Sequence, residues 1–173
     1  MDPSTIEVEV QIDDPFAGQA DPDSLERCAR ATLRHQRMGG PGALTIVVTG
    51  DGNVRRLNRA YRGVDATTDV LAFGDAEGDG FVTAPGAPRY LGDVIISLPR
   101  AEAQAGCAGH PLEAELQLLT VHGVLHLLGH DHAEPAEKTA MWAAQAEILR
   151  ALGAPVADPT PEETDTDSHG FHA

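Results

Sequence analysis

Residues 122–132 of this chain read His122-Gly123-Val124-Leu125-His126-Leu127-Leu128-Gly129-His130-Asp131-His132. Four of the eight histidines of the chain therefore lie within eleven residues. Imidazole is the commonest protein ligand for metals such as zinc. A single histidine on an apolar helix is usually a hydrogen-bonded core residue, whereas three histidines with a glycine among them favour a metal site.

The spacing of these histidines sets the geometry of a shared metal ion. In a helix, His122 and His126 lie roughly 40° apart around the axis and about 6 Å along it, so both rings can reach one ion. A continuing helix would carry the last two histidines about 12 and 15 Å beyond His122, too far to share that ion. We therefore predict that an apolar helix ends in a turn at Gly129, because glycine adopts the left-handed conformation at low cost. The third ligand then comes from the loop, and on spacing alone any of residues 130–132 can supply it.

The residue after the first histidine separates this motif from that of the metzincin proteases. Those enzymes carry H-E-x-x-H-x-x-G-x-x-H, in which the glutamate is the general base. Here Gly123 occupies the glutamate position and cannot accept a proton. Three protein ligands would leave a fourth position open, which is typical of a catalytic zinc site. The motif thus predicts metal-assisted chemistry and argues against that class of protease.

The length and composition of the chain favour one cytoplasmic domain. We expect a single domain over residues 1–153 of the 173-residue chain, followed by an acidic, disordered tail at 154–173. The N-terminus lacks the basic and apolar regions of a signal peptide, and no apolar run is long enough to cross a membrane. Only Cys28 and Cys107 are present, too few for a disulfide scaffold, as expected of a cytosolic protein.

The formal charge of −15 is unevenly distributed along the chain. Residues 1–23 hold seven acidic side chains and residues 153–173 hold five, and neither segment contains a lysine or arginine. Eight of the twelve basic residues lie between Arg27 and Arg62. A near-neutral body with a local concentration of arginines can bind a polyanion, although a solvated helix face is the simpler explanation for most of them.

The hydrophobic pattern predicts an α+β domain in which a small mixed β-sheet packs against about five helices. Alternating or β-branched runs indicate strands at residues 6–12, 44–49, 69–73 and 90–97. Capping residues, glycines and prolines delimit helices at residues 21–38, 53–61, 99–108, 111–128 and 135–152. The strands concentrate early and the helices late, which is typical of the α+β class.

A second segment with functional character runs from residue 57 to residue 71. Arg55, Arg59 and Arg62 lie on one helical face at four- and three-residue spacings. Arg62 stands just before a glycine turn, where its planar guanidinium could hold a phosphate by paired hydrogen bonds. The alternative is that Arg62 pairs with Asp65 or Asp69 and fixes the loop.

These segments together resemble the YbeY family of bacterial rRNA-maturation endoribonucleases. The resemblance covers about residues 44–150, and the motifs occur in the family's order. The residues that carry it are Leu57, Asn58, Tyr61, Arg62, Asp65, Thr68-Asp69-Val70-Leu71, Phe73, Leu91-Gly92-Asp93-Val94-Ile95-Ile96-Ser97 and the whole stretch 122–132.

The resemblance implies a zincin-like fold and a metal-dependent endoribonuclease specific for single-stranded RNA. It implies one zinc ion per chain, held by His122, His126 and His132, and catalytic roles for Arg62 and His122. It further implies action on rRNA precursors, in 16S 3′-end processing and ribosome quality control. The implied partners are RNA and the ribosome or its proteins, with no role expected for DNA or a membrane.

The chain departs from the family pattern at two places beside the second segment. The family commonly has Ser-Phe-Pro where this chain has Ala72-Phe73-Gly74, and residues 75–79 that follow are acidic. If that loop borders the RNA groove, it would alter substrate preference or weaken binding. The tail at 154–173 is a further departure.

Two other functions are compatible with the same residues. One is a zinc hydrolase acting on peptides or amides, against which Gly123 argues. The other is a ribosome-assembly factor in which the metal is structural. No separate general base is evident, and His130 and Asp131 are the nearest residues that could accept a proton.

Overall fold

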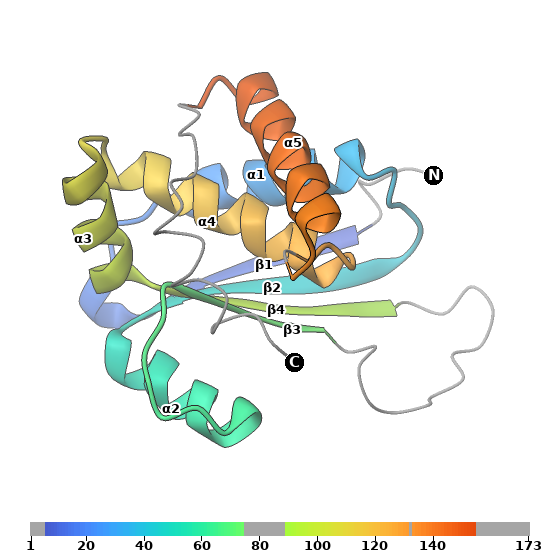
Figure 1. Ribbon diagram of the computed structural model, residues 1–173. Helices are drawn as coiled ribbons and strands as arrows, with labels where there is room; N and C mark the ends of the chain where they lie inside the picture. The colour runs from blue at the N-terminus through green and yellow to red at the C-terminus, as the bar shows by residue number, and fades with distance from the viewer. Residues whose placement is uncertain (1–5, 75–88, 132, 155–173) are drawn as a thin grey trace.

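The computed structural model describes residues 6–74, 89–131 and 133–154. Four strands form one sheet in the order β1-β2-β4-β3 (Figure 1). Their bounds are β1 (Ile6–Ile12), β2 (Gly42–Thr49), β3 (Val70–Gly74) and β4 (Arg89–Ser97). β1, β2 and β4 are mutually parallel, whereas β3 runs antiparallel to β4 and forms an outer strand of the sheet. The mixed sheet predicted from the sequence is therefore confirmed.

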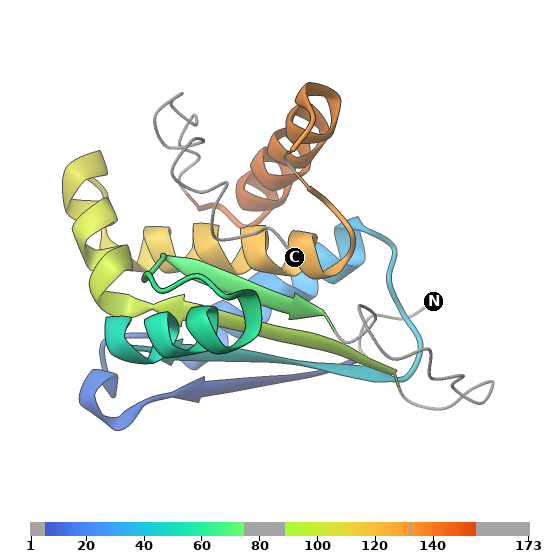
Figure 2. The ribbon, with the colours of Figure 1, turned by 60° about the horizontal axis from the view of Figure 1, so that its bottom comes forward.

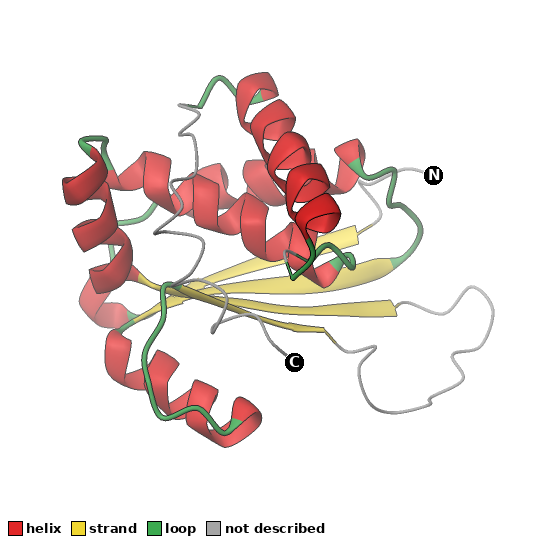
Figure 3. Cartoon of the chain, viewed as in Figure 1, coloured by secondary structure: helices red, strands yellow, loops and turns green. Residues whose placement is uncertain are grey.

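Five α-helices surround the sheet (Figure 3). They are α1 (Pro22–His35), α2 (Asp51–Arg62), α3 (Leu98–Ala108), α4 (Leu112–Leu127) and α5 (Pro135–Ala151). α1 and α4 cover one face of the sheet and α5 packs on both of them, while α2 lies on the opposite face (Figures 1 and 2). None of the described helices combines the length and apolar character needed to cross a membrane.

The alternation of side chains along the strands produces two separate apolar cores. Residues facing α1 and α4 include Val48, Val94 and Ile96, all completely buried in the larger core. Leu71 and Ile95 face the other way and pack with α2. Neighbouring residues of a strand point to opposite faces of the sheet, so the strand period of two assigns each side chain to its core.

The predicted elements are all present, and the main difference concerns the end of α1. The sequence predicted a helix to residue 38, but α1 ends at His35. Arg37 adopts a positive φ of 56°, and the Met38 N–H donates to the Leu33 carbonyl. This hydrogen bond closes a turn after α1, and the turn brings Met38 back against the larger core. A short 3-10 turn at Asp14–Phe16 was not predicted.

Candidate metal centre and the outer edge of the sheet

The C-terminal half of α4 carries His122 and His126 one turn apart, and we call these two residues the histidine pair. Their ring centroids lie 6.4 Å apart with an interplanar angle of 77°. His122 is almost fully buried and His126 is half-buried. The Nε2 atom of each ring is buried. The predicted helical spacing therefore does bring the two rings close together.

The orientation of His122 is set by α5. Its Nδ1 lies 2.9 Å from Oε1 of Gln145, and its ring lies 5.3 Å from the Trp142 ring. An amide oxygen can only accept a hydrogen bond, so Nδ1 of His122 is the donor. In a neutral imidazole this places the lone pair on Nε2, the atom that would bind a metal.

The turn after α4 follows the prediction. Gly129 has a φ of 102°, its N–H donates to the His126 carbonyl, and the His130 N–H donates to the Leu125 carbonyl. These two bonds form a Schellman motif, which satisfies the last carbonyls of a helix and reverses the chain. The chain after α4 therefore turns away from the helix axis, as a third ligand from the loop requires.

His132, the predicted third ligand, lies outside the described residues. Within the described part of the chain, no group of three histidine, cysteine or acidic side chains is placed to hold a metal ion. His130 directs its Nε2 to Oε1 of Gln36 at the end of α1, at 2.7 Å. Burial, and secondarily the charge of His35, lower the pKa of His130. The donors fit a metal because two imidazoles with buried Nε2 atoms lie on one helix face, and the contact with Gln145 favours the tautomer of His122 that a metal requires.

Gly123 lies where α4 packs directly against strands β3 and β4. A Cβ atom at this position would lie 2.6 Å from Cγ1 of Val94 and 3.4 Å from Cγ2 of Val70. Both valines are completely buried on strands β4 and β3. Glycine at the glutamate position of the metzincin motif therefore has a packing cause, because any larger side chain would overlap Val94 unless α4 or the sheet shifts.

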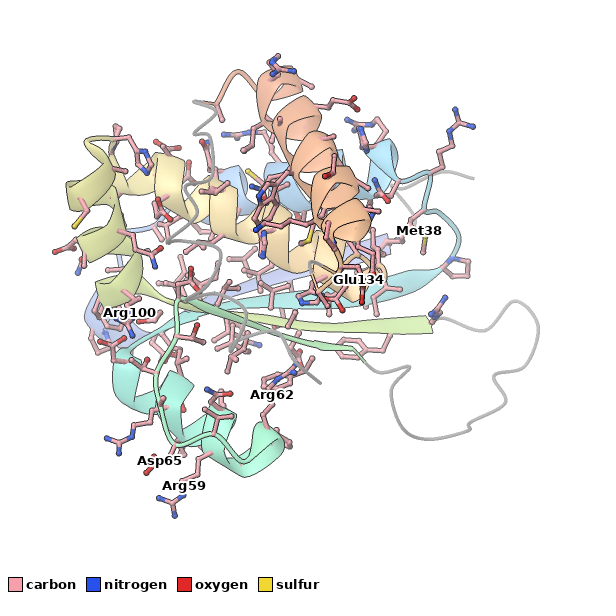
Figure 4. The ribbon with its side chains drawn as sticks, in the orientation of Figure 1. Met38, Arg59, Arg62, Asp65, Arg100 and Glu134 are labelled. Carbon is pink, nitrogen blue, oxygen red and sulfur yellow. The ribbon has the colours of Figure 1, made fainter. Side chains whose placement is uncertain are left out.

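Arg62 lies at the end of α2 beneath β3 (Figure 4). One of its terminal nitrogens donates to the Ala72 carbonyl at 2.6 Å. Its guanidinium carbon lies 5.1 Å from the centroid of the Phe73 ring, within the range of a cation–π contact. Its Nε is buried. The structure thus holds Arg62 against β3 through a backbone carbonyl and an aromatic ring.

The two carboxylates offered as alternative partners of Arg62 have other contacts. Asp65 accepts two hydrogen bonds from Arg55, at 2.8 and 3.2 Å, which lower the pKa of the Asp65 carboxyl. Asp69 accepts a hydrogen bond from the Val70 N–H at 2.8 Å. Complete burial raises the pKa of the Asp69 carboxyl despite this bond. Both carboxylates therefore help to shape the turn between α2 and β3.

The outer edge of β3 carries the residues that depart from the family pattern. The Ser97 N–H donates to the Asp69 carbonyl, and the pairs Val70–Ile96 and Ala72–Val94 follow in register. In an antiparallel ladder, residues that hydrogen-bond the neighbouring strand alternate with residues that do not. Counting from Asp69, which bonds Ser97, the backbone N–H and C=O groups of Ala72 and Gly74 therefore point away from β4, to the outer edge of the sheet. A proline at position 74, as in the family pattern, would therefore remove no hydrogen bond of the sheet. The acidic residues 75–79 lie outside the described residues.

Gln145 was not predicted to belong to this site. The one feature of the sequence that could have indicated it is a polar residue on the apolar stripe of α5, between the buried Met141 and Ile148. Gln145 itself is 8% exposed. A buried amide must find a hydrogen-bond partner, but the pattern within one helix does not reveal that the partner is His122.

Replacing Gln145 with leucine should weaken zinc binding about 10-fold or more, because partners of ligating histidines typically contribute 10–100-fold to affinity. Gln145→Glu keeps an acceptor for Nδ1 and should retain most of the affinity. Competition with a chromophoric chelator measures the zinc affinity of each variant. Gln117→Leu on α4, where the amide bonds Ser24 instead, is the matched control. Unchanged zinc affinity in Gln145→Leu would contradict the orienting role.

Comparison with known proteins agrees with the motifs and the fold. The family model for endoribonuclease YbeY matches residues 11–153. A Roseiflexus endoribonuclease YbeY is 48% identical over 155 residues, covering 88% of this chain and 97% of that protein. The Chloroflexus aurantiacus endoribonuclease YbeY is 49% identical over 150 residues, covering 86% and 96%.

A solved structure shares the architecture of this chain. The solution structure of a Thermotoga maritima protein matches with a TM-score of 0.53 and 20% identity, covering 89% of this chain and 97% of that one. At this level of identity the likeness concerns the fold alone. The family model and the two bacterial relatives carry the assignment: this chain belongs to the YbeY family of endoribonucleases.

Proposed function

We propose that this protein is a zinc-dependent endoribonuclease that cleaves single-stranded RNA during rRNA maturation. The observation that carries the proposal is the histidine pair, with His122 oriented by Gln145 so that Nε2 can bind a metal. Membership of the YbeY family supplies the reaction class and the RNA substrate. His132 completes the proposed ligand set of one zinc ion per chain.

The chemistry divides between the metal and the residues around it. When bound, zinc would polarise a phosphoryl oxygen or lower the pKa of a water molecule toward about 7. Gln145 and Trp142 hold the ring of His122 in one orientation, so little reorganisation is needed at the site. Arg62 stabilises the negative charge that develops on the phosphate, with its guanidinium positioned by the Ala72 carbonyl and Phe73.

The cellular role follows from the family. We place the protein in the cytoplasm, acting on the 3′ end of the 16S rRNA precursor and in ribosome quality control, with the ribosome or its proteins as partner. Peptide hydrolysis is the competing activity. The packing at Gly123 disfavours it, since the helical glutamate of metzincins has no space here.

A comparison of substrates tests the reaction class directly. Metal-loaded protein is incubated with single-stranded RNA, the same RNA in a duplex, and casein. We expect cleavage of the single strand, little cleavage of the duplex, and intact casein. Cleavage of casein without cleavage of RNA would overturn the proposal, and binding to ribosomes without any cleavage would favour the assembly-factor alternative.

Arg62→Ala should lower kcat for RNA cleavage by about 100-fold, the usual effect of removing one group that stabilises charge in a transition state. The KM should change much less. Because Arg62 also contacts β3, thermal unfolding of the variant must be measured beside the kinetics. Arg62→Lys should recover more of the contact with the Ala72 carbonyl than of kcat, because lysine and arginine are not interchangeable where a planar guanidinium is needed. A folded Arg62→Ala protein with unchanged kcat would exclude the catalytic role.

A further inference from the structure

Tyr61 is the most exposed large hydrophobic side chain in the described part of the chain. It is 72% exposed, whereas Tyr90, the other such residue, is 38% exposed. Tyr61 lies in the last turn of α2, next to Arg62. The metal site makes no use of it, and the α2 core formed with Leu71 and Ile95 does not include it.

The ring of Tyr61 rests on a fixed support. Its centroid lies 5.4 Å from that of Phe73, with an interplanar angle of 53°. Phe73 belongs to β3 and also carries the Arg62 guanidinium, 5.1 Å from its centroid. One strand residue thus holds an exposed aromatic ring and a cation side by side. Exposed aromatic rings beside cations are the combination that binds the bases and phosphates of single-stranded nucleic acids.

The charges around Tyr61 favour a polyanionic partner. Arg56 and Arg59 are exposed on α2, and within the described residues Arg59 makes no ion pair or hydrogen bond. Arg59 also lies near the exposed carboxylate of Asp65 (Figure 4), and its charge helps to lower the pKa of that carboxyl, but both Asp65 oxygens accept hydrogen bonds from Arg55. This surface is therefore locally basic in a chain with a formal charge of −15.

Tyr61 and the histidine pair belong to the same end of the sheet but to opposite faces, so a strand of RNA that contacts both must pass around the outer edge of β3. The C-terminal halves of α2, β3 and α4 point the same way in two views of the molecule (Figures 1 and 2). α2 packs against β3 from one face of the sheet and α4 from the other. Tyr61 thus lies on the α2 side of β3, while the histidine pair lies on the side of α4.

We propose that Tyr61 is a stacking platform that binds one base of a single-stranded RNA, with Arg59 contacting the adjoining phosphate. The proposal rests on the RNA substrate of the proposed function. It adds a reason for a preference for single strands, since a base within a duplex is stacked on its neighbours and cannot lie on the tyrosine ring.

Binding of a labelled single-stranded RNA to the full-length, metal-loaded protein tests the platform by fluorescence anisotropy, with RNA integrity checked on a gel. Tyr61→Leu should raise Kd at least about fivefold, the lower limit for loss of one stacked base. For a sugar-phosphate strand that lacks bases, the same variant should change Kd less than about twofold. Tyr61→Phe and Tyr61→Trp keep an aromatic face and should bind like the parent protein.

The chain offers matched controls for both residues. Tyr90→Leu removes the other exposed tyrosine, whose hydroxyl donates to Asp93 of β4, and should leave RNA binding unchanged. Arg59→Gln should reduce the slope of log Kd against log salt by about one unit. Arg34→Gln, an exposed arginine of α1, should not change it.

Two outcomes would overturn the platform. One is an unchanged Kd in Tyr61→Leu, and the other is an equal loss of affinity for the strands with and without bases. A parent protein that cleaves RNA while Tyr61→Leu binds normally would leave the proposed function standing and remove the platform. RNA binding that depends on Tyr61 but is never followed by cleavage would support the platform and overturn the proposed endoribonuclease function.

Discussion

His126→Ala is expected to abolish stoichiometric zinc. Loss of one of three imidazole ligands should weaken zinc binding by more than roughly 100-fold, since even the outer partners of ligands contribute 10–100-fold. RNA cleavage should fall with the metal content. Elemental analysis of the purified protein measures bound zinc, and chelator competition gives the affinity. Full zinc retention in this variant would refute the proposed site.

The neighbouring histidines provide the controls for the metal site. His132→Ala should lose zinc like His126→Ala, because the family resemblance assigns the third ligand to His132. His130→Ala should retain it, because the imidazole of His130 is directed to Gln36 at the end of α1. Zinc lost from His130→Ala but kept by His132→Ala would move the third ligand to His130.

Gly123→Glu would complete the metzincin motif, and we expect it to prevent folding. A carboxylate at this position would be forced into the core between α4 and the sheet, where Val94 already leaves too little space for a Cβ atom. Burial of an unpaired charge adds several kcal/mol to the steric cost, against a total stability of about 5–15 kcal/mol. Soluble expression and circular dichroism measure the outcome. A stable, folded Gly123→Glu protein would show that α4 and the sheet can separate at little cost.

A milder substitution gives the same test in a protein that folds. Gly123→Ala should lower the free energy of unfolding by about 1–3 kcal/mol through overpacking. Gly106→Ala in α3 is the matched control, because nothing lies within 4 Å of a Cβ there and alanine favours a helix. The double variant Gly123→Ala/Val94→Ala should lose less free energy of unfolding than the sum of the two single losses, by at least about 0.5 kcal/mol. Strict additivity would argue against direct contact.

The helices and strands of this fold could be predicted because their sequence signals are local. The alternation from residue 6 to 12 and the β-branched run in β2 correspond to strands that the structure contains. The apolar run of α4 and the glycine turn at Gly129 are also present. The end of α1 was misplaced because Arg37 adopts a left-handed conformation without a glycine to indicate it. That conformation accompanies the tertiary packing of Met38 against the larger core.

The metal site was predictable only in its spacing along one helix. Residues four apart in a helix share a face, so His122 and His126 could be paired without knowledge of the fold. The resemblance of the motifs, and not their geometry, selected His132. Arg62 was expected to bind a phosphate or a carboxylate, and the structure shows two contacts that were not expected, with a backbone carbonyl of β3 and with the Phe73 ring. Those contacts arise only when α2 packs against the sheet.

The sequence by itself determined the helices and strands, the spacing of the histidine pair and the turn that ends α4, because each depends on residues close together in the chain. Tertiary structure alone decided which partner orients each functional group. Gln145 on α5 contacts His122 across 23 residues of sequence, and Val94 on β4 restricts the space for a side chain at Gly123 on α4. Such contacts depend on the close packing of whole elements against each other, and no local pattern encodes them. The cluster of histidines therefore indicated a metal, whereas the packing around Gly123 explains why the protease glutamate is absent.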